Sequence, residues 1–134
     1  MEKCKITSKN KIFTFTEQRS SLTLLNTDQV TSTKIHVDGC EINDSGIRCD
    51  YMHIAKETEM YIELKGQDLI HAMDQIIRTI GMLSFDPKKC KKLSYIICTR
   101  SPLTSTEIQI YDRQFRAKFN SKLIIKSSPF TDTY

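Results

Sequence analysis

The chain has 134 residues, a formal net charge of +4 and a pI near 8.8, with 39% hydrophobic and 27% charged residues. This composition, with only 4 Gly and 3 Pro, is typical of one soluble domain spanning residues 1–134 and excludes a long linker. The chain lacks an apolar run near the roughly 20 residues of a membrane span and an apolar signal core, so we expect a cytoplasmic protein without membrane contact.

The first 60 or so residues favour β-structure. In residues 1–19, Phe13 and Phe15 alternate with polar residues and indicate a strand, although Glu17 could open a helix instead. Along the rest of the chain, alternation or a short apolar run predicts strands at residues 21–26, 31–42, 47–54, 59–65, 93–99 and 122–127. Turn residues at 43–46 and 55–58 join three of these strands into an antiparallel meander.

Apolar residues at helical spacing predict a helix over residues 68–82, with the Asp68 carboxylate at its start. A strand on either side of this helix indicates a parallel crossover. Residues 104–115 are ambiguous, and we favour a helix that opens at Ser105; residues 128–134 are expected to form a frayed tail. The expected fold is therefore α/β (α+β), with a mixed sheet of an antiparallel meander, a helix crossover and further strands.

The number and spacing of the five cysteines predict that all of them are reduced thiols. They stand at Cys4, Cys40, Cys49, Cys90 and Cys98. Their number is odd and no Cys-x-x-Cys pair occurs, so the spacing indicates neither a disulfide framework nor a common zinc module. Reduced thiols agree with the expected cytoplasmic location.

Three ionisable residues belong to the central hairpin. In residues 61–65, Glu63 and Lys65 point to the same face of the strand. If the preceding strand pairs antiparallel with this one, Asp50 lies opposite the strand's end. Carboxylates held close together repel each other unless a cation lies between them, and oxygen ligands suit Mg²⁺ or Mn²⁺. The pattern therefore predicts a divalent-metal site.

This order of residues and elements resembles the PD-(D/E)XK superfamily of restriction-endonuclease-like nucleases. The Asp is Asp50, preceded by Cys49 in place of Pro, and the Glu-x-Lys is Glu63-Leu64-Lys65. The resemblance covers a core of about residues 34–99, in which the motif strands lead directly into a helix. It implies a restriction-endonuclease-like core.

The resemblance also implies a mechanism. Asp50, Glu63 and the backbone carbonyl of Leu64 would bind Mg²⁺ or Mn²⁺, which would polarise a phosphodiester oxygen and lower the pKa of a bound water. Lys65 would orient that water or stabilise the charge that develops on phosphorus oxygens.

The same resemblance suggests two further active-site residues. RecB-like members have a Gln on the following helix and a Tyr four positions later. Gln75 matches the Gln and would help to position metal-bound water or phosphate, whereas Thr79 stands at the Tyr position. Glu17 is the candidate for the N-terminal Glu, carried by a helix, that is common in the superfamily.

Two groups of lysines could contact a polyanion. They are Lys3, Lys5, Lys9 and Lys11 near the N-terminus, and Lys88, Lys89, Lys91 and Lys92 before the strand at 93–99. Each group is either a solvated segment or a phosphate-binding surface, and the second interpretation requires that the groups flank the acidic site. We expect the second group to bind nucleic acid.

We therefore expect a metal-dependent nuclease that hydrolyses phosphodiester bonds, with DNA favoured, acting as a homodimer or within a larger complex, in defence, repair or a mobile element. The alternative is a non-catalytic nucleic-acid- or protein-binding module with the same fold. A third hypothesis is an interaction subunit whose sheet pairs with a partner. The residues themselves also allow other roles: Glu63 and Lys65 could form a solvent-exposed charge pair, and Asp50 could be a turn or cap acid. The absence of a Gly-x-Ser-x-Gly elbow and of a Gly-rich phosphate loop argues against serine hydrolases, kinases and dehydrogenases.

Overall fold

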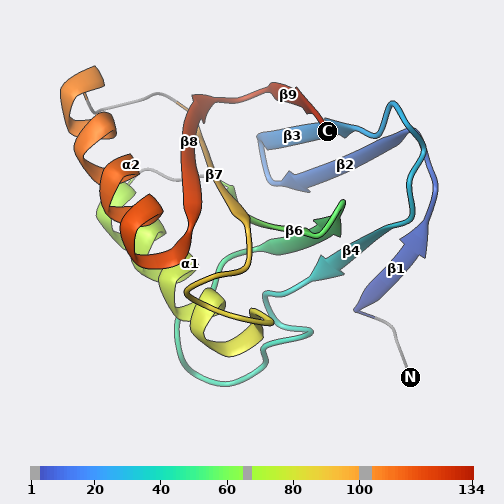
Figure 1. Ribbon diagram of the computed structural model, residues 1–134, viewed down its shortest axis with the longest axis horizontal. Coiled ribbons are helices and arrows are strands. Elements are labelled where there is room, and N and C mark those ends of the chain that lie inside the picture. The colour runs from blue at the N-terminus through green and yellow to red at the C-terminus, as the bar shows by residue number, and fades with distance from the viewer. Residues whose placement is uncertain (1–3, 65–67, 100–103) are drawn as a thin grey trace.

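The structure, a computed structural model, describes residues 4–64, 68–99 and 104–134. Two helices and nine strands follow one another in this part of the chain (Figure 1). In chain order they are β1 (Lys5–Ser8), β2 (Ile12–Glu17), β3 (Ser20–Leu25), β4 (Ser32–His36), β5 (Tyr51–Ala55), β6 (Thr58–Leu64), α1 (Leu69–Leu83), β7 (Lys92–Cys98), α2 (Ser105–Phe119), β8 (Ser121–Ser127) and β9 (Phe130–Thr133).

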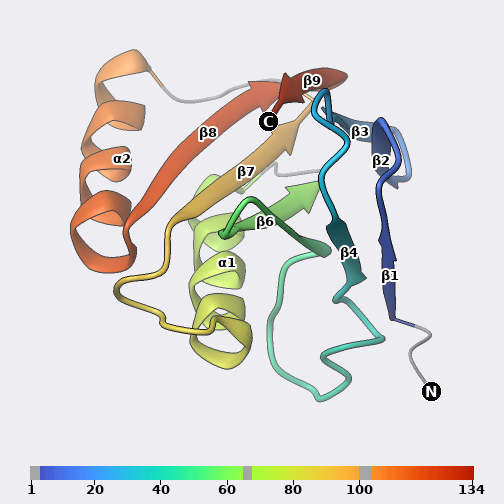
Figure 2. The ribbon, with the colours of Figure 1, turned by 45° about the vertical axis from the view of Figure 1, so that its right-hand side comes forward.

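A six-stranded sheet in the order β1-β4-β5-β6-β7-β8 forms the centre of the molecule. In this sheet, neighbouring strands are antiparallel from β1 through β4 and β5 to β6. The remaining strands, β6, β7 and β8, run parallel to one another. Parallel neighbours need crossover connections, which α1 and α2 supply. Both helices cover one face of this sheet, and a second sheet in the order β2-β3-β9 covers the other (Figures 1 and 2). The expected mixed α+β class and the crossover after the meander are confirmed.

Each face of the central sheet buries its own apolar cluster. On the helix side, Ile76 of α1 packs in one cluster with Tyr61 of β6. On the other side, Phe15 and Leu22 of the small sheet pack in a second cluster with Ile62. Because both faces are covered, all seven residues of β6 are buried. An ionisable residue on β6 is therefore removed from solvent.

The two helices begin at capping residues that stabilise their first turns. Asp68 is the N-cap of α1, where its carboxylate accepts a hydrogen bond from the His71 N–H at 3.1 Å. Thr104 and Glu107 form a capping box at the start of α2, so the ambiguous residues 104–115 are helical, as favoured. Neither helix of the described chain has the length and apolar character needed to cross a lipid bilayer.

In the first half of the chain, three segments differ from the sequence predictions. β4 ends at His36, and the chain turns at Gly39 with φ of 74° instead of continuing as a strand to residue 42. β5 begins only at Tyr51, because residues 47–49 bind α1. Glu17 ends β2, and a tight turn with Gln18 at φ of 51° leads into β3, so the helical alternative for this segment is wrong.

The C-terminal residues are not a frayed tail. Phe130–Thr133 form β9, which pairs parallel with β3. The Tyr134 hydroxyl is hydrogen-bonded to Ser32 Oγ at 2.6 Å and to His53 Nε2 at 2.9 Å. The prediction failed because the partners of this short segment are distant in the chain: Ser32 lies 102 positions before Tyr134, and β3 lies earlier still.

Cys4 and Cys40 form a disulfide, so the prediction that all thiols are reduced is wrong for this pair. The bond joins the N-terminal side of β1 to the loop that follows β4. Cys49, Cys90 and Cys98 are free, as expected. The spacing of 36 positions carries no signal of this bond, because it is the pairing of β1 with β4 that brings the two cysteines together.

His53 lies between the two sheets and makes the stability depend on pH. Its side chain is completely buried and packs against Phe13 and Phe15, with ring centroids 4.6 and 5.4 Å apart. Burial, assisted by the positive charge of Lys34, lowers the pKa of His53 to about 4. The pKa of an unfolded histidine is about 6.5, so the unfolded chain takes up this proton first. The neutral ring therefore makes its full contribution to the free energy of unfolding above about pH 6.5, and this contribution is lost as the pH falls towards 4.

The free energy of unfolding is therefore expected to fall by roughly 3 kcal/mol between pH 6.5 and 4 on account of His53, at 1.36 kcal/mol for each pKa unit. A His53→Gln variant should show a correspondingly flatter profile in urea titrations over this range. The matched control is His36→Gln, because His36 is exposed. Equal pH profiles for wild type and His53→Gln would contradict the prediction.

Candidate active site

The β5–β6 hairpin brings Asp50 to the end of β6. Lys56 and Glu57 form the two-residue turn, and both have positive φ, 51° and 58°, as in a type I′ turn. This turn sets the register in which Tyr51 pairs with Ile62. Asp50 immediately precedes β5 and therefore reaches β6 beside its last residues, where the sequence predicts it.

Asp50 is held by backbone groups on both sides. Its N–H donates to the Ile62 carbonyl at 3.1 Å. Its carbonyl accepts from the Val37 and Asp38 N–H groups at 3.0 and 3.3 Å, which is the pattern of a β-bulge. One carboxylate oxygen accepts from the Leu64 N–H at 2.8 Å. The side chain is thus oriented across the sheet and does not shape a turn.

Asp50 and Glu63 form a buried pair of carboxyl groups. Their exposed fractions are 8% and 7%, so the alternative of a solvent-exposed charge pair is wrong for Glu63. Burial raises the pKa of Asp50 to about 6, and the negative charges of Glu17 and Asp38 act in the same direction. The Leu64 N–H and the neighbouring Glu63 carboxyl oppose that rise in pKa. Because Asp50 binds the Ile62 carbonyl and the Leu64 N–H, its carboxyl lies beside the end of β6 that carries Glu63, and a divalent cation can stabilise two carboxylates held close together.

Glu17 approaches this pair from the second sheet. It is the last residue of β2 and is half-buried. Its charge raises the pKa of Asp50 and also that of the Tyr51 hydroxyl. Glu17 therefore adds negative potential near the pair, although it stands on a strand and not on the helix that the resemblance implies.

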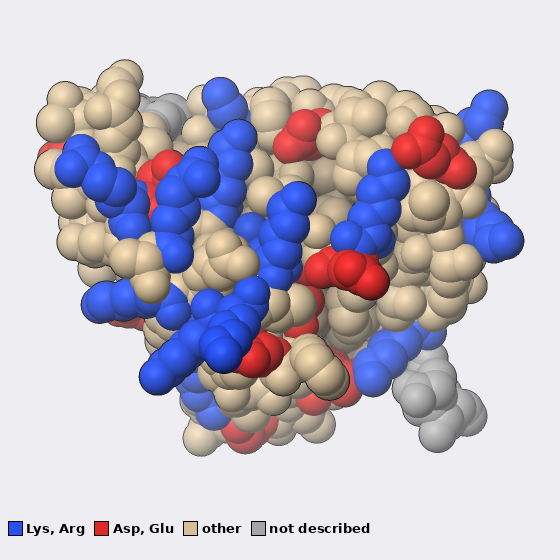
Figure 3. Space-filling view, viewed as in Figure 1, with Lys and Arg blue, Asp and Glu red and all other residues tan. Residues whose placement is uncertain are grey.

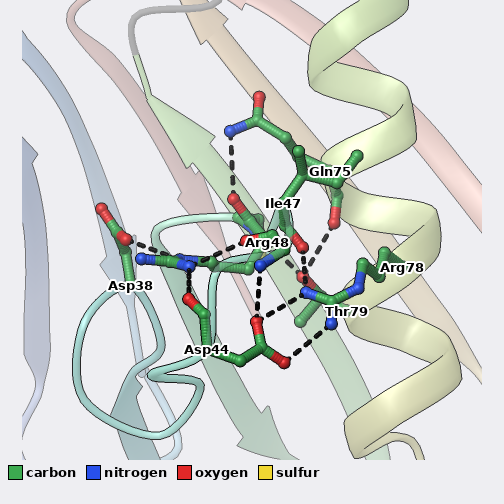
Figure 4. Close-up of polar contacts among 9 residues, drawn as sticks. Asp38, Asp44, Ile47, Arg48, Gln75, Arg78 and Thr79 are labelled. Atoms are coloured by element: carbon green, nitrogen blue, oxygen red, sulfur yellow. Dashed lines mark hydrogen bonds and ion pairs between the residues drawn. The ribbon is translucent and has the colours of Figure 1, made fainter.

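Helix α1 fastens the residues just before Asp50 (Figure 4). Gln75 Nε2 donates to the Arg48 carbonyl at 3.0 Å. The Thr79 hydroxyl accepts from the Cys49 N–H at 2.9 Å and donates to the Gln75 carbonyl at 2.8 Å. Gln75 therefore uses its amide nitrogen to position the backbone that carries Asp50, and its contact with metal-bound water or phosphate stays a prediction.

Two ion pairs that the sequence does not indicate hold the loop between β4 and β5. Arg48 Nε pairs with Asp38 Oδ1, and Arg78 Nη2 of α1 pairs with Asp44 Oδ2, each at 2.8 Å (Figure 4). Arg78 also donates to the Ile47 carbonyl at 2.7 Å. Local sequence spacing does not predict these contacts, because Arg78 lies 34 positions from Asp44. They keep the loop that binds the Asp50 carbonyl in place.

The oxygen donors near the end of β6 could form an open Mg²⁺ site, in contrast to a site closed by protein ligands on all sides. Within the described ranges, no three His, Cys, Asp or Glu side chains surround one metal position. Mg²⁺ usually takes one or two carboxylates and completes its shell with water and substrate phosphate oxygens. Asp50, Glu63 and the Leu64 carbonyl could supply such a set. Lys65 lies outside the described residues, so its role stays a prediction.

The lysines at 88–92 do not flank the acidic pair. Lys92 pairs with Glu59 near the start of β6, whereas Glu63 lies near its end. Four residues along a strand correspond to about 13 Å. Lys88, Lys89 and Lys91 are exposed and can meet phosphates, but at the opposite end of the parallel strands from the acidic pair.

Lys92 cannot be the nucleic-acid contact that the sequence suggests, because only 1% of its surface is exposed. Its ammonium donates to the carbonyls of Asp86, Cys90 and Phe119 at 3.0, 2.6 and 2.9 Å. Burial lowers the pKa of Lys92, and the charge of Glu59 opposes this shift. Lys92 therefore joins the loop before β7 to the end of α2.

No family model matches the chain, and no curated protein or solved structure shows significant similarity to it. The resemblance to PD-(D/E)XK nucleases thus depends on the residues and their arrangement alone. The features relevant to a catalytic role are the acidic pair, Asp50 and Glu63, and the α1 residues Gln75 and Thr79 that position the backbone before Asp50.

Proposed function

We propose that the protein is a metal-dependent nuclease with a restriction-endonuclease-like core. The observation that carries the proposal is that two buried acids lie at the same end of the β5–β6 hairpin: Asp50, which binds the Leu64 N–H just before β5 begins, and Glu63 of β6. The order of elements supports it, because the antiparallel strands β4, β5 and β6 are followed by α1 and by the parallel strand β7.

The residues of the chain would divide the work as follows. Asp50, oriented by the Leu64 N–H, and Glu63 would bind the ion together with the Leu64 carbonyl. The chemistry expected of Mg²⁺ or Mn²⁺ here is polarisation of a phosphodiester oxygen and a lowered pKa of a bound water. The negative charge of Glu17 favours a cation at this position. Lys65 is proposed to orient the attacking water or to stabilise the negative charge of the transition state.

The test is cleavage of labelled single-stranded and double-stranded DNA and RNA in Mg²⁺, in Mn²⁺ and in EDTA. We expect cleavage with either metal, with DNA preferred, and none in EDTA. Absence of cleavage from every substrate and metal would reject the proposal and favour a non-catalytic binding module with this fold.

A further inference from the structure

A groove follows the open edge of the central sheet. In the described chain the sheet order ends at β8, so the outer side of this strand has no neighbouring strand. The groove has a volume of about 450 Å³ and lies between α2 and β9. Ile108 lines it on the α2 side and Phe130 on the β9 side, with Lys122, Ile124 and Lys126 of β8 between them. We call this feature the β8 groove.

Two lysines of β8 give the groove a net positive charge, because they outnumber the one carboxylate, Asp132, that lines it. Lys122 and Lys126 are both exposed and stand four residues apart, or about 13 Å along the strand. The exposed lysines of the loop before β7 extend this line, because Asn120 Nδ2 binds the Lys89 carbonyl at 2.8 Å and so holds the loop beside the start of β8. Figure 3 shows basic side chains gathered over the part of the face where Figure 1 places α2, β8 and this loop.

An aromatic ring accompanies the charges. Phe130 is half-buried, and the Lys126 ammonium lies 5.8 Å from its ring centroid. Proteins that bind single-stranded nucleic acid combine a basic groove along the backbone with aromatic rings on which bases stack. Bases within a duplex are covered by their neighbours, so such a ring favours an unpaired strand.

The groove also leads towards the acidic pair. The parallel register places Leu64, Ile97 and Lys126 in one row across β6, β7 and β8. Lys126 therefore lies two strands, or about 10 Å, from Leu64 and at the same end of the sheet as the acidic pair. A strand bound in the groove would be directed to the catalytic end of β6.

We propose that the β8 groove binds a single-stranded segment of nucleic acid, with Lys122 and Lys126 on its phosphates and Phe130 against a base. The link to cleavage rests on the proposed function, whereas the binding does not. A second copy fits this edge poorly, because pairing of two β8 strands would bring lysines of like charge together. An acidic peptide would match the charges but supplies no base for Phe130.

The test measures binding of a fluorescent thymidine oligonucleotide by anisotropy in EDTA over a range of salt concentrations. The double variant Lys122→Gln/Lys126→Gln should reduce the slope of log affinity against log salt by about 1.4, since each single-strand phosphate contact contributes about 0.7. The control Lys9→Gln/Lys11→Gln removes two other exposed lysines and should leave the slope unchanged. Equal slopes for wild type and the β8 double variant would overturn the proposal.

The variant Phe130→Leu keeps an apolar side chain but removes the ring. It should weaken oligonucleotide binding about fivefold or more without changing the salt slope, because stacking contributes about 1–3 kcal/mol for each base. Unchanged affinity, or poly-glutamate competing as well as the oligonucleotide, would overturn the proposal. Binding without any cleavage in metal would reject the nuclease function and leave the β8 groove as a binding site.

Discussion

Glu63→Gln is expected to reduce metal-dependent cleavage at least roughly 10³-fold while the variant unfolds at the same temperature as the wild type or a higher one. Glutamine keeps the shape of Glu63 but cannot supply the negative charge that binds the ion. It also takes one of two neighbouring acids out of a buried site, so the fold should not be weakened. Asp50→Asn should behave similarly, because its amide oxygen can still accept from the Leu64 N–H.

Thermal unfolding gives a second measurement that does not require cleavage. Mg²⁺ or Mn²⁺ should raise the melting temperature of the wild type, because a ligand that binds only the folded state stabilises it. The rise should be absent in Glu63→Gln and retained in the control Asp74→Asn, which changes an exposed acid on α1. The assignment of Glu63 as a metal ligand would be contradicted if Glu63→Gln cleaved at the wild-type rate, or if metal raised the melting temperature of both proteins equally.

Lys92→Met is expected to lower the free energy of unfolding by roughly 3–5 kcal/mol, the cost typical of removing one partner from a buried charged cluster. The substitution leaves three backbone carbonyls, those of Asp86, Cys90 and Phe119, without their donor. It also leaves Glu59 buried without the nearby positive charge. Urea unfolding followed by circular dichroism measures the loss.

The neighbouring residue provides the matched control. Lys91 is exposed, so Lys91→Met should change the stability by no more than about 0.5 kcal/mol. Under conditions in which Lys92→Met is folded, its affinity for nucleic acid should equal that of the wild type. A stable Lys92→Met with reduced affinity would instead restore Lys92 as a nucleic-acid contact.

Local sequence was sufficient for the hairpin and the helix that position the acidic pair. The turn at residues 55–58 and the alternation of β6 set a register over few residues, and Asp50 lies only 14 positions from Leu64. The helix after β6 follows from its apolar spacing and the Asp68 cap. Short-range periodicity and turn chemistry determine such features, so the position of Asp50 beside the end of β6 could be predicted without coordinates.

Tertiary structure alone decided which charged residues are buried and what the distant segments bind. Lys91 and Lys92 are indistinguishable in the sequence, yet one faces solvent and the other binds three carbonyls, because α2 ends beside β7. The pairing of β9 with β3 and the Cys4–Cys40 bond likewise join residues far apart in the chain. Periodicity reports the environment of a residue within its own element, whereas these contacts depend on which elements pack together.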